Sequence, residues 1–149
     1  MTWIEPVFDR TQADVEYAMR QMAEWRATGK TNTFDLKGCL NVNDINRIEN
    51  NIAYLATNLS SLYYFSVPVT KTWERTQIPT SDDVDRILNN VRELNEAFYQ
   101  SPEAPPVPDG LFTISQVNDL EENLYQLKTM LDNMISSFKQ SGAFECGEE

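Results

Sequence analysis

The feature that most constrains the fold of this chain is a helix-start pattern that occurs four times. A threonine or asparagine is followed three residues later by an aspartate or glutamine, which makes a capping box. The first side chain accepts hydrogen bonds from free amides of the first turn, and the second side chain reaches back to the backbone of the first. The four pairs are Thr11 with Asp14, Asn41 with Asp44, Thr80 with Asp83, and Thr113 with Gln116. The pattern predicts four helices and the start of each.

After each capping pair, apolar residues recur at alternating spacings of three and four. The first series is Val15, Ala18, Met22 and Trp25, two others begin at Ile45 and Val84, and the longest runs from Val117 to Phe138. Such spacings are the a and d positions of a heptad and place the residues along one side of a helix. Four apolar seams bury one another most simply in a bundle. We therefore predict one all-α domain over residues 1–149, a four-helix bundle with helices at about 12–28, 42–62, 81–99 and 114–140.

The second and third predicted helices resemble each other beyond the heptad pattern. Six of the twelve positions from Asp44 to Leu55 match those from Asp83 to Leu94. An old duplication and shared heptad constraints both explain the match, and the second explanation is the simpler, although it leaves the shared asparagine pairs 50–51 and 89–90 unexplained. Because these asparagines flank the apolar seam, we expect them to face solvent.

The predicted connections, at about 29–40, 63–79 and 99–112, are longer than the roughly 2–8 residues that antiparallel neighbours need. Connections of this length cross over the bundle, carry function, or do both. The third contains Pro102, Pro105, Pro106 and Pro108. These prolines favour an extended polyproline strap along the bundle over a ligand for an aromatic groove.

Aromatic residues gather in the middle connection and in the two predicted extended tails, 1–9 and 141–149. We interpret residues 63–79 as extended, with a short hairpin or an edge strand as alternatives. The aromatic side chains either cover the core or contact a partner protein. The candidates for partner contact are Tyr63, Tyr64, Phe65, Trp73, Trp3, Phe8 and Phe144.

The composition removes most catalytic chemistry. The chain has no histidine, and its two cysteines, Cys39 and Cys146, stand far apart. Histidine-based catalysis and zinc–histidine sites are therefore excluded, and no glycine-rich phosphate loop is present. We expect no enzyme activity, no cofactor and no metal. Twelve basic and 23 acidic residues give a net charge of −11, which argues against binding of nucleic acid or anionic membranes. We find no apolar run long enough to span a membrane and no signal peptide.

Several segments resemble one family. They are FDRTQADVEY (8–17), KGCLNVNDINRIENNIAYLATNL (37–59), the stretch from Trp73 to Leu94, PPVPDGL with NDLE (105–121), and SGAFECGE (141–148). They resemble small helical proteins encoded in the structural and tail gene clusters of phages and prophages of Firmicutes.

The resemblance implies a virion component, made in the host cytoplasm and associated with the tail tip, baseplate or fibres. Its partners would be other virion proteins and further copies of itself, in a trimer or a hexamer-related ring. A small acidic intracellular inhibitor that mimics nucleic acid for a host factor is the alternative, because residues 101–149 hold nine acids and two bases.

Overall fold

The computed structural model describes residues 1–29, 36–98 and 102–140. It contains four helices, α1 (Gln12–Thr28), α2 (Val42–Ser60), α3 (Ser81–Phe98) and α4 (Ile114–Gln140), and the described residues form no strand. The prediction of an all-α four-helix bundle is confirmed, and each predicted helix end lies within two residues of the observed one. No helix in this part of the chain has the length and apolar character that crossing a membrane requires.

All four predicted capping boxes form. At α3, for example, the Asp83 N–H donates to Thr80 Oγ1 at 3.2 Å, and the Thr80 N–H donates to Asp83 Oδ2 at 2.9 Å. The same reciprocal bonds join the capping pairs of α1, α2 and α4. Gly29 ends α1 with φ of 69° and donates its N–H to the Trp25 carbonyl oxygen at 2.7 Å, as a left-handed C-terminal glycine does. Local hydrogen bonding therefore fixes where the helices begin, and Gly29 fixes where α1 ends.

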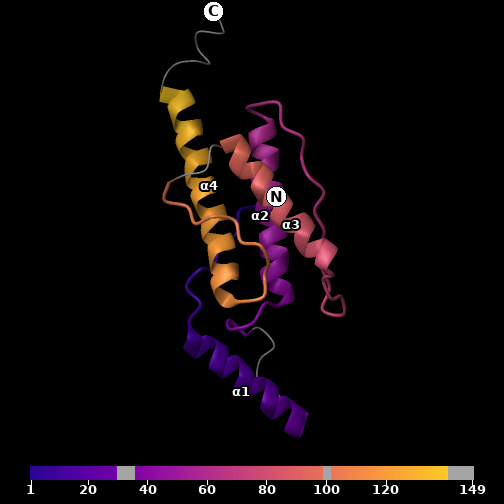
Figure 1. Ribbon diagram of the computed structural model, residues 1–149. Helices are drawn as coiled ribbons and strands as arrows, with labels where there is room; N and C mark the ends of the chain where they lie inside the picture. Colours follow the sequence, from indigo (N-terminus) through magenta and orange to yellow (C-terminus); the bar gives the residue numbers. More distant parts are fainter. Residues whose placement is uncertain (30–35, 99–101, 141–149) are drawn as a thin grey trace, which may run out of the picture.

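The helices α2, α3 and α4 pack against one another pairwise and run in the same direction (Figure 1). Parallel neighbours require each connection to return along the whole bundle. The 18 residues of α3 span about 27 Å at ~1.5 Å per residue, a distance that a two-residue turn does not cover. This direction explains why the connections are long, and the predicted crossovers are confirmed.

The core lies between these three helices. It is built from the predicted heptad residues of α2, α3 and α4, including Ile52, Leu55, Val91, Leu94 and Leu124, all fully buried. Trp73 and Leu111, from the two crossover connections, close its sides. Burial of a side chain of this size contributes roughly 1.5–3 kcal/mol, so this core is the main source of stability.

Helix α1 lies apart from the core, at the end where the other helices begin (Figure 1). Ala18 is its one buried residue, whereas Met22 is 43% exposed and Trp25 is 52% exposed. The expectation that the first apolar seam would be buried like the other three is therefore wrong. Its short seam contains an alanine and offers little area for packing.

The middle connection does not form the hairpin that was one alternative for it, whereas the proline-rich connection forms the predicted strap. Residues 63–79 cross the bundle without strand pairing, so the hairpin and edge-strand alternatives are wrong. In the proline segment, Ala104 is buried and Val107 packs on the core. Asn123 Nδ2 donates to the Pro105 carbonyl oxygen at 2.9 Å and holds this strap against α4.

Candidate functional site

Three extended segments lie along the bundle, and asparagine side chains hold them there. We name them the N-terminal arm (residues 1–10), the second strap (63–73) and the third strap (102–111). On the arm, the Ile4 N–H donates to Asn51 Oδ1 at 3.1 Å, and Asn51 Nδ2 donates to the Ile4 carbonyl oxygen at 2.7 Å. A primary amide offers one acceptor and two donors, so it satisfies both backbone groups of one extended residue.

The same two-bond clasp occurs at two further places. Asn118 of α4 clasps Arg10 of the arm, with distances of 3.2 and 3.0 Å. Asn46 of α2 clasps Trp73 of the second strap, with distances of 2.7 and 2.9 Å. Each clasp replaces the strand partner that an isolated extended segment lacks.

The sequence suggested that the asparagines beside the seams face solvent, but some of them are buried. Asn51 has no exposed surface, and Asn90 is 7% exposed and donates to the Val69 carbonyl oxygen at 3.0 Å. The expectation of solvent-facing asparagines is wrong for these two and holds for Asn89, which is exposed.

Two buried glutamates lie beneath the arm and the second strap. Glu121 of α4 accepts from Arg47 Nε at 2.5 Å and from the Val7 N–H of the arm at 3.3 Å. Glu49 of α2 accepts from the guanidinium of Arg86 and, at 3.1 Å, from the Lys71 N–H of the second strap. Each glutamate thus joins an arginine of a neighbouring helix to the backbone of the segment that covers it.

These contacts follow one numbering from the helix caps Asn41, Thr80 and Thr113. An asparagine lies five residues after two of the caps, and an arginine lies six residues after two of them. A glutamate lies eight residues after two of the caps, and an asparagine lies ten residues after all three. The arm and the second strap meet these side chains in the same order, from the tenth position to the fifth. The arm is held on α2 and α4 as the second strap is held on α3 and α2.

The equivalence of the arm and the straps shows how α1 is placed within the chain. The second and third straps lead directly into the helices that they cover, α3 and α4. The arm covers α2, but α1 stands between the arm and α2 in the chain. Helix α1 is therefore an element inserted into the first of three strap-and-helix units, and it lies outside the common core.

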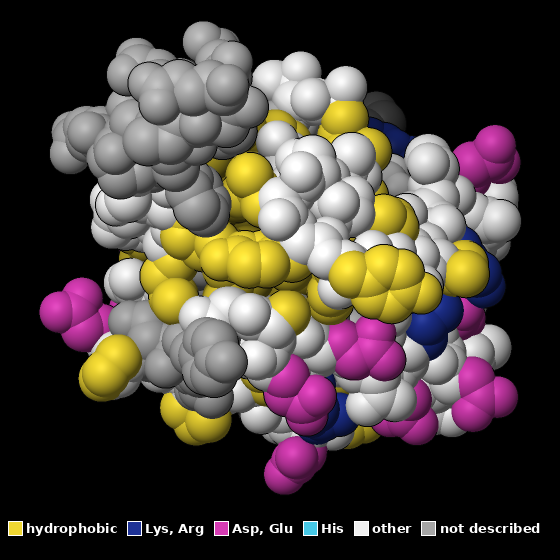
Figure 2. Space-filling view, turned by 90° about the horizontal axis from the view of Figure 1, so that it is seen from above, with side chains coloured by type: hydrophobic (Ala, Val, Ile, Leu, Met, Phe, Trp, Pro, Cys, Tyr) yellow, Lys and Arg dark blue, Asp and Glu magenta, His cyan; other side chains and the backbone are white. Residues whose placement is uncertain are grey.

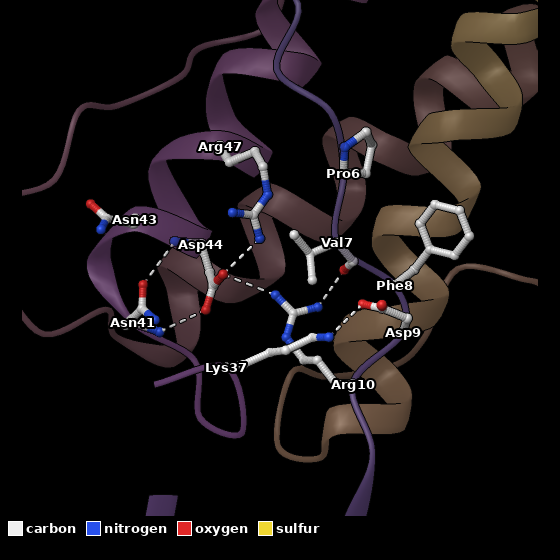
Figure 3. Close-up of a pocket in the computed structure, with 10 residues that line it drawn as sticks. All are labelled: Pro6, Val7, Phe8, Asp9, Arg10, Lys37, Asn41, Asn43, Asp44 and Arg47. Atoms are coloured by element: carbon white, nitrogen blue, oxygen red, sulfur yellow. Dashed lines mark hydrogen bonds and ion pairs between the residues drawn. The ribbon is translucent and has the colours of Figure 1, made fainter. Parts of the chain in front are cut away.

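The arm contributes a buried arginine to an ion-pair network. The Arg10 side chain is 1% exposed, and its Nη2 lies 2.9 Å from Asp44 Oδ1 and 2.8 Å from Glu121 Oε2. Arg47 Nη2 contacts the same Asp44 oxygen at 2.6 Å (Figure 3). Burial alone would lower the pKa of Arg47, but hydrogen bonds and charges from Glu121 and Asp44 raise it, so Arg47 stays ionised. Two cations and two anions balance, which makes their burial tolerable.

A cavity of about 690 Å³ lies beside this network, between the arm and the start of α2. Its lining comprises Pro6, Val7, Phe8, Asp9, Arg10, Lys37, Asn41, Asn43, Asp44 and Arg47 (Figure 3). Lys37 Nζ lies 2.9 Å from Asp9 Oδ1, so each charged side chain of this lining faces one of opposite sign. Across the described residues, no group of three or more metal-binding side chains comes together. The geometry of this lining supports anchoring of the arm.

The anchored arm leads into α1, which leaves several large apolar side chains exposed. Tyr17 is 46% exposed, and Met19, Met22 and Trp25 are 64%, 43% and 52% exposed. Met19, Met22 and Trp25 follow at spacings of three, so they lie on neighbouring turns of one side. We call Met19, Met22 and Trp25 the α1 surface, because Tyr17 lies on the other side of the helix from Met19 and Met22. It is the strongest candidate for a binding site, because exposed apolar groups of this size mark interaction surfaces.

The predicted contact residues divide into two groups. Trp73 is 8% exposed and belongs to the core, Phe65 and Trp3 pack against it, and Phe8 lies against Tyr125 with ring centroids 5.4 Å apart. These four side chains help to hold the arm and the second strap. Phe144 lies outside the described residues.

Tyr63 and Tyr64 remain exposed, at 53% and 105%, just after α2 ends. This is the end of the bundle opposite α1, and Figure 2 shows hydrophobic side chains gathered on it. Partner contact by these two tyrosines stays a prediction.

Several important residues escaped the sequence analysis, among them Arg10, Glu49 and Glu121. For the two glutamates, the signal was present in the segments NRIENN (46–51), DRILNN (85–90) and NDLEEN (118–123). Alignment of all three at their caps places the asparagines and glutamates in register.

Comparison with known proteins gives no match to this chain, whether among protein-family models, curated proteins or solved structures.

Proposed function

We propose that this protein is a structural component of a phage particle, associated with the tail, and that it acts through protein–protein contacts. The observation that carries the proposal is α1, a helix inserted outside the core that turns the apolar α1 surface to solvent. Its partners are further copies of the chain and other virion proteins.

The physics of α1 supports a binding role. A helix of 17 residues is marginal in water without packing, and α1 buries one side chain. Methionine and tryptophan are enriched at protein interfaces, where flexible thioethers and large rings fill irregular gaps. A partner on the α1 surface supplies the burial that the chain itself leaves out.

The resemblance of five segments to proteins of phage tail gene clusters supports the location. Oligomers of identical chains favour closed symmetry, and a contact between two different surfaces closes into a ring when the rotation allows it. The chain offers apolar residues at both ends, the α1 surface at one and Tyr63 and Tyr64 at the other. This arrangement fits a trimer or a hexamer-related ring.

The test is quantitative proteomics on density-purified particles of a phage that encodes this chain. We expect a fixed copy number relative to the major tail protein, in a multiple of three or six. Absence from particles together with abundance in infected cells contradicts the proposal.

A matched pair of variants links the particle result to the α1 surface. Met22→Glu with Trp25→Ala is expected to abolish self-association and incorporation into particles. Phe112→Ala changes an aromatic residue that is 89% exposed elsewhere, and it is expected to leave both unchanged. Loss of incorporation with both variants, or with neither, contradicts a specific role of α1.

The charge favours a second candidate, a small acidic inhibitor that imitates nucleic acid. The buried Arg10 and the half-buried Arg47 and Arg86 are cancelled by the buried anions Asp44, Glu49 and Glu121. The rest of the chain therefore carries the whole net charge of −11. An acidic inhibitor would lose its partner steeply as salt rises, whereas binding through the α1 surface would respond little.

A further inference from the structure

The groove between α2 and α4 binds the N-terminal arm by contacts that do not depend on the covalent link between them. Asn51 and Asn118 bind arm backbone, and Glu121 and Asp44 bind the Arg10 side chain. We infer that this groove accepts the arm of a second copy of the chain, so that neighbouring copies exchange arms.

The groove needs an arm to be complete. Without Arg10, Arg47 alone faces the carboxylates of Glu121 and Asp44, which leaves an unbalanced buried charge. An arm from a neighbouring copy restores the same balance, because it brings the same arginine and the same backbone groups. The partner copy thus contributes a residue to this site.

The length of chain between the arm and α2 makes exchange feasible. The second strap reaches its helix within seven residues, from Trp73 to the cap Thr80. The arm and α2 are separated by 31 residues, from Arg10 to the cap Asn41, and this stretch includes α1. The short connection forces the second strap and α3 to pair within one chain. The long connection between the arm and α2 imposes no such restraint on their pairing.

Helix α1 has the shape of a spacer between two bundles. Its 17 residues extend about 25 Å at ~1.5 Å per residue, away from the other helices (Figure 1). Exchange of an identical element is a low-cost route to oligomers, because it repeats contacts that already exist. In an exchanged assembly α1 passes from one copy to the next, and the α1 surface lies between two bundles.

This inference deepens the proposed assembly function and rests on it, but one experiment separates the two. In full-length protein with Cys39→Ser and Cys146→Ser, one population carries Thr2→Cys and a second, size-tagged population carries Asn50→Cys. The site is defined, because Asn50 Nδ2 donates to the Thr2 carbonyl oxygen at 2.8 Å. The control replaces Asn50→Cys with Asn89→Cys, the exposed asparagine at the same position after the cap of α3.

The two populations are unfolded together, refolded at about 1 mM and treated with a short bismaleimide. That concentration matches the millimolar effective concentration of a flexible connection, so about half of the arms are expected to bind another chain. Because each chain carries only one of the two cysteines, every cross-link between these two positions joins two chains. The Asn89→Cys control is expected to give no such product.

Two results would overturn arm exchange. One is a chain carrying both Thr2→Cys and Asn50→Cys that cross-links only within itself while the mixed populations give no heterodimer. The other is an Asn89→Cys control that cross-links equally well. If light scattering still shows an oligomer that depends on Met22 and Trp25, arm exchange fails while the proposed function stands.

Discussion

Arg47 and Arg86 occupy equivalent positions in α2 and α3, each six residues after the helix cap, and each binds a buried glutamate of a neighbouring helix. Arg47 binds Glu121 of α4, and Arg86 binds Glu49 of α2. The two ion pairs set the register of α4 against α2 and of α2 against α3. They also place each glutamate where it accepts a backbone N–H from the segment above it.

The asparagine clasps predict that the arm is fixed by side-chain amides. Asn51→Ala removes the two hydrogen bonds to Ile4 and leaves the Ile4 backbone groups without this partner, so we expect a loss of about 1–3 kcal/mol in the free energy of unfolding. Urea unfolding measures this loss, and limited proteolysis is expected to cut within residues 1–10. Asn89→Ala, at an exposed position, is the control. Equal effects of the two substitutions would contradict the role of the clasp.

The buried network predicts a large cost when one charge is removed. Glu121→Gln leaves Arg10 and Arg47 facing Asp44 alone, and we expect a loss of about 3–5 kcal/mol. Asp132→Asn breaks the exposed pair with Lys128 on α4 and is expected to cost about 0.3–0.5 kcal/mol. Denaturant unfolding of the two variants decides the question, and comparable losses would show that the network is not a buried unit.

Acid is expected to weaken the start of α3 through Asp83. The ion pair with Lys71 and the hydrogen bonds from Thr80 hold the pKa of this carboxyl well below its ordinary 3.8. Because the folded-state pKa lies below the unfolded-state pKa, this stabilisation is present above pH 3.8 and disappears as the pH falls through the folded-state value. The free energies of unfolding of the wild type and Asp83→Asn should therefore converge in acid. Asp82→Asn is the control, and a constant difference down to the acid limit would contradict the assignment.

The helices were predictable because their signals are local. A capping box and a heptad seam need only the residues of one helix, so Thr80, Asp83 and the series after them placed α3 correctly. The parallel direction of α2, α3 and α4 was not predictable from the seams, since a heptad seam serves parallel and antiparallel neighbours equally. The long connections were the one indication that the chain crosses over.

The site was hidden because its residues lie at positions that usually face solvent. Glu49 and Glu121 lie beside the seam, where a charged side chain is expected to be exposed to solvent. Each becomes buried only when an arginine of another helix and the backbone of a strap complete it. That information is distributed over three segments, so the periodicity of any single helix does not contain it.

Gly38 is expected to control the placement of α1. A Cβ atom at this position would lie 2.1 Å from the Asp14 carbonyl oxygen and 2.5 Å from the Val15 nitrogen, both backbone atoms of the first turn of α1. Gly38→Ala must therefore displace α1 from the segment that leads into α2. Gly110→Ala is the matched control, because its Cβ meets only the ring of Phe112, a side chain that is 89% exposed and free to turn.

The displacement can be measured through Trp25, which lies on α1. We expect Gly38→Ala to change the tryptophan fluorescence and to speed amide hydrogen exchange across α1, while the core amides of α2 and α4 keep their protection. The helix that lies outside the core should thus respond separately from it. Exchange rates in α1 that match those of the Gly110→Ala control would show that the contact between Gly38 and the first turn does not hold α1 in place.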